Sequence, residues 1–426
     1  MMLPCLLTRV AFRTPPPMIH IRLLLCLVFA SASSLAQTPP SAVANSNEGA
    51  RSLWEEFMTR MQTDYLEPVD EIALTRKAVD ILAAENPAFS SLPKPRDYGT
   101  TPEACRSAFH QYVVAFAFKA GRRMDATAVV ELAIQRLCER HLRFAQYIPA
   151  STQAELATLG KANLGMRIEV SENGRFYCQP FAGEAAALAG IEAGDELIAL
   201  DGVPVEGMNR WKLKVKLYGT DGSKAEVRVR QTTGRIITAE LIRRINNGLR
   251  VTATSGISGT TIRIPLFDGN TLSDLRAALQ TVRPGSPLTL DLRGNGGGEI
   301  PPAVDTAALF IDGPRPLLLC KQQRRGQPDV DLSSNEAMMP GFKRLNVLMD
   351  GGTASSAELF ISILTEAPAL RVALSGTRTY GKDIWLEGAT LKNGGGELYL
   401  PMGNMVTTGG KRWTNGIEPT TFGMKK

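Results

Sequence analysis

KRLNVLMDGGTASSAELFISILTEA (residues 343–367) begins as an apolar strand-like run, turns through two glycines and continues into an apolar helix-like run. Strand, tight turn and helix in this order are typical of an α/β fold. Two serines, Ser355 and Ser356, stand where the helix is expected to begin. A helix N-terminus favours negative charge, so a serine held there can act as a nucleophile. The alternative is that Thr353 or Ser355 only caps the helix, as Ser and Thr commonly do.

The scarcity of histidine narrows the choice of a general base. The chain contains only His20, His110 and His141, and all three lie far from the serines in the sequence. Because histidine is the usual base for a serine, a Ser-His-Asp triad is not expected. A lysine serves instead when burial lowers its pKa toward neutrality. The candidate is Lys382 in TRTYGKDIW, where aromatic residues flank it, and a surface lysine in a loop is the alternative.

A glycine-rich turn follows a second predicted strand in LTLDLRGNGGGE (residues 288–299). Such a turn can bring backbone N–H groups close to a substrate carbonyl, as an oxyanion hole requires. Its spacing does not match the G-x-G-x-x-G pattern of dinucleotide-binding proteins. The alternative is a tight strand-to-helix turn without chemistry.

Three kinds of pattern divide the 426 residues. Residues 51–150 carry apolar residues at helical spacing and predict a helical N-terminal domain, preceded by a linker at 37–50. Residues 160–244 contain short alternating runs between Gly and Asp turns, which predict a mostly β domain. Residues 245–426 alternate strand and helix patterns and end in a predicted hairpin around 393–396. We therefore expect a multidomain α/β protein.

The net charge of +6 is unevenly distributed. The first 36 residues hold three arginines and no acidic residue, so the remaining chain has 45 basic and 42 acidic residues. No basic stripe is interleaved with aromatic residues, so we expect no nucleic-acid partner.

Residues 1–36 have the pattern of a signal peptide. An apolar run, Leu23 to Ala30, follows Arg22, and Ser34-Leu35-Ala36 offers a cleavage site between small residues. The apolar run is shorter than the ~20 residues of a membrane span, which favours cleavage over the alternative of a membrane anchor. We therefore expect an exported protein, periplasmic or extracellular.

Four cysteines remain beyond residue 36. In an oxidising compartment Cys105 and Cys138 could form a disulfide, and the alternative is four separate buried thiols, including Cys178 and Cys320. No Cys-x-x-Cys pair is present, so a metal site is not expected.

Taken together, these motifs resemble the C-terminal processing (tail-specific) peptidases of family S41. LTLDLRGNGGG is similar to that family's strand-to-glycine motif, GGTASSAELF to its nucleophile motif, and TRTYGKD to its Gly-Lys motif. GGKRWTNGIEPT is similar to its C-terminal Gly-Ile-Glu-Pro segment, and AALAGIEAGDELIALDGVPVEGM resembles its inserted PDZ domain. The resemblance implies a PDZ-like β domain at 160–244 and a crotonase/ClpP-like α/β peptidase core at 245–426.

Carried over by position, the resemblance implies Ser355 as nucleophile and Lys382 as general base. It implies backbone N–H groups of Ser356 and of the turn at 296–297 as oxyanion donors, with Gly297 chosen between the two glycines. Ser356 is the alternative nucleophile. The implied activity is that of a serine endopeptidase that forms an acyl-enzyme and needs no metal or organic cofactor.

One departure from the family concerns the group that orients the lysine. The family often has Gln four residues after its lysine, whereas this chain has Leu386, which cannot hydrogen-bond, followed by Glu387. Glu387 is the substitute that we consider, although a carboxylate beside Lys382 would raise its pKa, which is wrong for a base.

The PDZ-like segment supplies the expected substrate. Its residues Leu164, Gly165, Met166, Arg167 and Ile168 resemble the PDZ carboxylate-binding loop, which receives a peptide C-terminus while the peptide adds as a β-strand. The resemblance implies protein or peptide substrates with apolar C-termini, and a homodimer through the helical domain is left open. The rival interpretations are a peptide-binding pseudoprotease and a different enzyme on a similar α/β core.

Overall fold

The computed structural model describes residues 46–85, 92–120, 124–160, 162–171, 174–181, 183–245 and 250–420. The expected signal peptide, and the expected linker up to residue 45, lie outside these residues. Within them, no helix combines the length and the apolar character that crossing a membrane requires.

The N-terminal part is helical, as predicted. Its helices are α1 (Ser46–Thr63), α2 (Glu71–Glu85), α3 (Pro102–Ala120), α4 (Ala126–Arg140) and α5 (Ala150–Ala157). Asp125 caps α4 by accepting a hydrogen bond from the N–H of Ala128 at 2.8 Å. Trp54 of α1 packs against Phe109 of α3 with ring centroids 4.1 Å apart, in a cluster that joins α1 to α4.

A separate six-stranded sheet occupies the middle of the chain, which we call the middle region (residues 160–244). Its strands are β2 (Met166–Val170), β3 (Phe176–Pro180), β4 (Glu196–Leu200), β5 (Val203–Pro204), β6 (Lys224–Arg230) and β7 (Ile236–Ile242). The order is β2-β3-β4-β6-β7, and β5 pairs with β4, so β2 lies at an edge. Two helices, α6 (Ala185–Leu188) and α7 (Arg210–Leu217), complete this region, which has its own hydrophobic cluster.

The third part is built on a mainly parallel sheet, as its alternating pattern predicted. The strand order is β14 (Arg371–Gly376), β13 (Arg344–Met349), β10 (Leu288–Asp291), β9 (Gly259–Arg263) and β8 (Thr252–Gly256). Only β8 is antiparallel to its neighbour. Parallel neighbours need long connections, which here contain the helices α8 (Thr271–Gln280), α9 (Ile300–Ala308) and α10 (Ser356–Glu366).

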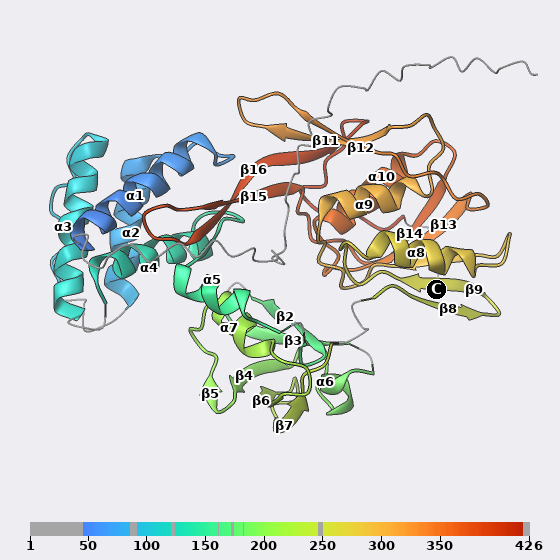
Figure 1. The fold of residues 1–426 in the computed structure, drawn as a ribbon, viewed down its shortest axis with the longest axis horizontal. Helices are drawn as coiled ribbons and strands as arrows, with labels where there is room; N and C mark the ends of the chain where they lie inside the picture. Colours follow the sequence, from blue (N-terminus) through green and yellow to red (C-terminus); the bar gives the residue numbers. More distant parts are fainter. Residues whose placement is uncertain are drawn as a thin grey trace, which may run out of the picture.

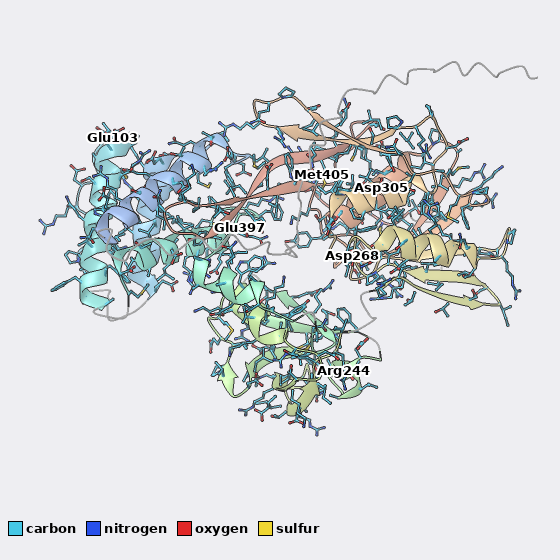
Figure 2. All side chains as sticks on the ribbon, viewed as in Figure 1. Glu103, Arg244, Asp268, Asp305, Glu397 and Met405 are labelled. Atoms are coloured by element: carbon cyan, nitrogen blue, oxygen red, sulfur yellow. The ribbon has the colours of Figure 1, made fainter. Side chains whose placement is uncertain are left out.

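A third sheet joins the helical part to the C-terminal part of the chain. It contains β1 (Gln146–Ile148), β11 (Leu317–Arg324), β12 (Val330–Ser334), β15 (Ile384–Thr390) and β16 (Glu397–Thr407). β15 and β16 form the predicted hairpin, which reaches from the parallel sheet to the helices α1–α4 (Figure 1). Figure 2 shows Glu397 at the helical end of β16 and Met405 at the other end. Leu391, Leu398 and Leu400 enter the helical cluster, so that hydrophobic core combines residues from both ends of the chain.

All four described cysteines are buried free thiols. The Cys105–Cys138 disulfide is therefore not formed, and the alternative of separate thiols is confirmed. Burial in apolar surroundings raises the pKa of Cys138, as expected for a thiol that packs as a small hydrophobic side chain.

Candidate active site

The candidate nucleophile, Ser355, lies in a strained turn between β13 and α10. Its backbone has φ 59° and ψ −122°, and it is partly exposed. Residues other than glycine rarely adopt a positive φ, and such backbone strain costs about 1–3 kcal/mol. The conformation therefore needs support from the surrounding structure.

Glu358, three residues later, supplies that support. Its side chain is fully buried and accepts hydrogen bonds from the N–H of Ser355 at 2.9 Å and the N–H of Lys382 at 2.8 Å. It also accepts from the N–H of Gly381 and from the hydroxyl of Thr379, both at 2.6 Å. One carboxylate thus joins the serine turn to the loop that carries the candidate base. Burial raises the pKa of Glu358, although these four donors oppose the shift.

Lys382 has the electrostatic setting that a base requires. Burial, together with the positive charge of Arg210, lowers its pKa to about 8, while Glu358 acts in the opposite direction. Its Nζ lies over the ring of Phe144, 5.5 Å from the centroid. No hydrogen bond joins this Nζ to Ser355, although both residues are described. The structure therefore links the two segments through Glu358 while the amine rests on the helical part of the protein.

The C-terminal segment holds the lysine loop in place. The N–H of Thr379 donates to the carbonyl of Ile417 at 3.1 Å, and the N–H of Ile417 donates back to the Thr379 hydroxyl at 2.7 Å. The indole N–H of Trp413 donates to the Lys382 carbonyl at 3.1 Å. Gly381 has φ +93°, and a Cβ there would lie 2.7 Å from the backbone of Gly416. The segment GGKRWTNGIEPT thus holds the loop that carries Lys382 in position.

The glycine turn packs directly against the serine turn. Gly297 has φ +102°, and a Cβ there would lie 2.8 Å from the Cβ of Ser355. Its N–H already donates to the side chain of Asn295 at 2.9 Å. The N–H of Gly297 is therefore not free in this arrangement, and its role as an oxyanion donor stays a prediction. Gly296 is exposed, and its N–H donates to no acceptor in the described part of the chain.

The two adjacent serines have different surroundings. The hydroxyl of Ser356 is buried and donates to the carbonyl of Gly298 at 2.9 Å, whereas Ser355 is partly exposed. The backbone N–H of Ser356, in the first turn of α10, has no acceptor among the described residues. The side chain of Ser356 thus joins α10 to the glycine turn, and its backbone N–H is available to a ligand at the helix N-terminus.

Glu387 does not have Lys382 as its partner. Its carboxylate lies 3.7 Å from Arg324, and it borders a cavity of about 100 Å³ that is also lined by Arg60 of α1 and by Asp64, the residue after α1. A slip of the pairing between Trp385 and Leu386 accompanies this placement. Glu387, one position after Leu386, thus faces the helical part of the protein.

The predicted carboxylate-binding loop occupies the edge of the middle region. Leu164 and Met166 are buried in its cluster, with Ile168 packed against them, and Gly165 has φ +76°. The N–H of Gly165 is occupied, because it donates to Asn163 at 2.8 Å. Arg167 instead reaches the glycine turn, where its guanidinium donates to the carbonyl of Gly294. The sequence did not predict this contact or the four hydrogen bonds of Glu358.

Comparison with known proteins finds peptidases that are similar to most of this chain. Carboxyl-terminal-processing peptidase 1, chloroplastic, from Arabidopsis thaliana is 26% identical over 387 residues, which cover 86% of this chain and 75% of the relative. The carboxy-terminal processing protease CtpA of Bacillus subtilis is 26% identical over 294 residues, 67% of this chain and 61% of the relative. A solved structure of a photosystem II D1 C-terminal processing protease shares the fold, with a TM-score of 0.58 and 22% identity. It matches over 83% of this chain and 93% of that chain.

The chain is thus similar to C-terminal processing peptidases over most of its length. Residues 260–421 match the family model "Peptidase family S41".

Proposed function

We propose that this protein is an exported serine endopeptidase in which Ser355 is the nucleophile and Lys382 is the general base. The neutral Nζ of Lys382 accepts the proton of the Ser355 hydroxyl as Oγ attacks the carbonyl carbon of a peptide bond. The tetrahedral oxyanion is stabilised by the N–H of Ser356 and, in place of Gly297, by that of Gly296. The Lys382 ammonium then returns the proton to the leaving amine, which leaves an acyl-enzyme, and water releases the acyl group by the same steps.

The observation that carries this proposal is the carboxylate of Glu358. It accepts hydrogen bonds from both Ser355 and Lys382, so it holds a strained serine and a lysine of depressed pKa in one buried network. If Glu358 only capped helix α10, the bond from the N–H of Ser355 would be sufficient, and the bond from the N–H of Lys382 would not be needed. Strain and a perturbed pKa at one place are typical of a catalytic site.

Catalysis requires one movement of a side chain. The Lys382 Nζ must leave the Phe144 ring and turn to the Ser355 hydroxyl, because proton transfer needs hydrogen-bond distance. The guanidinium of Arg167 connects the middle region to the glycine turn. Binding of a substrate to the middle region can therefore affect the position of the glycine turn beside Ser355. We propose that the described arrangement is a resting form.

The middle region is proposed to act as a PDZ-like domain that recognises protein C-termini. Its β2 edge has no neighbouring strand among the described residues, so a peptide can add there as a further strand. The apolar residues of the loop, among them Leu164 and Met166, suit an apolar terminus. The Arabidopsis and B. subtilis relatives are named for C-terminal processing, which agrees with this substrate class.

Cleavage of an unfolded test protein with an apolar C-terminus tests this function. The wild-type protein should cleave it, and Ser355→Ala should not. Equal cleavage by both proteins would refute the role of Ser355. Binding of C-terminal peptides without any cleavage by the wild type would instead identify a peptide-binding pseudoprotease.

A further inference from the structure

Basic side chains from three parts of the chain meet around the candidate lysine. The ring of Phe144, after α4, contacts two of them: Arg143 is 4.8 Å and Lys382 5.5 Å from its centroid. The middle region contributes Arg210, at the start of α7, whose charge acts on both Lys382 and Tyr380. Helical part, middle region and catalytic loop therefore each supply a cation to one place.

Helix α7 presents two cations and two aromatic rings together. Arg210 lies 5.3 Å from the ring centroid of Trp211. Lys214, one turn later, lies 5.8 Å from the rings of both Trp211 and Tyr218. Asn209 caps this helix through the N–H groups of Trp211 and Lys212, which fixes the first turn and therefore the position of Arg210.

These cations lack a bound carboxylate. Among the described residues, no carboxylate oxygen lies within 4 Å of Arg210, Lys214 or Lys382. Glu139 attracts Arg210, but its carboxylate is already bound by Arg136 at 2.6 Å. Arg293 of the glycine turn, by contrast, is paired with Asp291 at 2.8 Å.

This arrangement is unfavourable in the absence of an anion. Burial lowers the pKa of Arg210, Lys214 and Lys382, and the charge of Arg210 lowers the pKa of both lysines further. Arg210 is nevertheless exposed to solvent, so it is surrounded by protein but can still be reached by a ligand. Like charges that lie close together attract an anion.

We propose that Arg210 and Lys214 form a subsite for a carboxylate of the substrate polypeptide, beside Lys382. The inference deepens the proposed function, because it makes the substrates polypeptides with an acidic group near the cleaved bond. The guanidinium can bind a carboxylate through two parallel hydrogen bonds. The faces of Trp211 and Tyr218 offer apolar contact to the adjoining residues of the same peptide.

Binding to the Ser355→Ala protein tests the subsite without cleavage. Labelled peptides would share an apolar C-terminus and carry Glu or Gln at one position, which is moved along the peptide. We expect the Glu peptide to bind about tenfold more tightly at the best position, as one charge-assisted hydrogen bond implies. Arg210→Gln should remove this preference. Lys212→Gln, an equal change of charge at an exposed position of α7, should retain it.

The outcomes separate this subsite from the proposed peptidase activity. Equal affinity for Glu and Gln peptides at every position would overturn the subsite, and so would equal losses in Arg210→Gln and Lys212→Gln. Arg210→Glu should reverse the preference toward a peptide with Lys at that position. Amidation of the peptide C-terminus distinguishes a terminal carboxylate from a Glu side chain as the bound group, since amidation removes only the terminal carboxylate. If the wild type cleaves nothing, the proposed activity fails while the binding preference still decides the subsite.

Discussion

Replacing Glu358 by Gln changes one atom of the side chain and tests whether the buried network positions the catalytic groups. The carboxylate accepts four hydrogen bonds: Oε2 from the N–H of Ser355 and of Lys382, and Oε1 from Thr379 and Gly381. A glutamine has one acceptor oxygen. In either orientation the amide N–H groups of the glutamine would face two of these four donors. Those two donors would then have no acceptor.

The size of the effect follows from these bonds. Each hydrogen bond to a charged group contributes about 1.5–3 kcal/mol, so two lost bonds remove on the order of 3–6 kcal/mol. A neutral amide is easier to bury than a carboxylate, which offsets part of this loss. A net cost of about 2–4 kcal/mol is as large as or larger than the strain energy of Ser355, about 1–3 kcal/mol. We therefore expect the serine turn to relax, and a displacement near 1 Å lowers the rate about 100-fold.

The assay is steady-state cleavage of a peptide with an apolar C-terminus, with thermal unfolding as the control for folding. We expect Glu358→Gln to lower kcat about 100-fold and to leave KM nearly unchanged, because the middle region keeps its structure. Glu366→Gln is the matched control at the other end of α10. That side chain accepts from Thr407 at 2.7 Å and Gly409 at 3.1 Å, away from the site. A folded Glu358→Gln protein with the wild-type kcat would refute the reasoning.

Three further predictions concern the same site. Ser356→Ala should lower the free energy of unfolding by about 1 kcal/mol, through loss of one buried hydrogen bond, and should still cleave peptides; inactivity with an intact fold would argue that its hydroxyl reacts. Activity should rise as the pH passes about 8, because Lys382 acts as the neutral amine and its lowered pKa supplies that form; Lys382→Arg stays charged and should be inactive, and a flat pH profile would count against the lysine. Gly297→Ala should abolish cleavage because its Cβ meets Ser355 at 2.8 Å, whereas Gly326→Ala, also at positive φ but in open space, should cost stability only.

Several features of the fold could be predicted because they depend on local patterns. The helical spacing of 51–150 and the alternation of 160–244 appear as helices and as a sheet, and the Asn393–Gly396 turn closes a hairpin. The short strand β1 was not predicted, since three residues carry no periodicity of their own. It exists because it pairs with β16, about 250 residues away in the chain, and distant pairing leaves no local signal.

The candidate site was predicted in part. The motif residues Ser355 and Lys382 were identified from their neighbours, and the structure links them through Glu358. The sequence did not show that the N–H of Gly297 donates to Asn295 in this arrangement, because the direction of one N–H depends on the path of the whole turn. Glu387 was considered from its distance along the chain, but its strand directs it toward Arg324.

The sequence alone indicated the similarity to C-terminal processing peptidases that the comparisons also show. Its strand, turn and helix periodicities, its glycine motifs and its shortage of histidine are local properties, so they could be recognised without coordinates. Only the tertiary structure decided the state of the chemical groups. The pKa of Lys382 depends on burial and on Arg210, which lies far away in the chain, and its Nζ rests on Phe144 of the helical part. Electrostatic and hydrogen-bonding energies depend on distances of a few ångströms, which the packing of all three parts fixes.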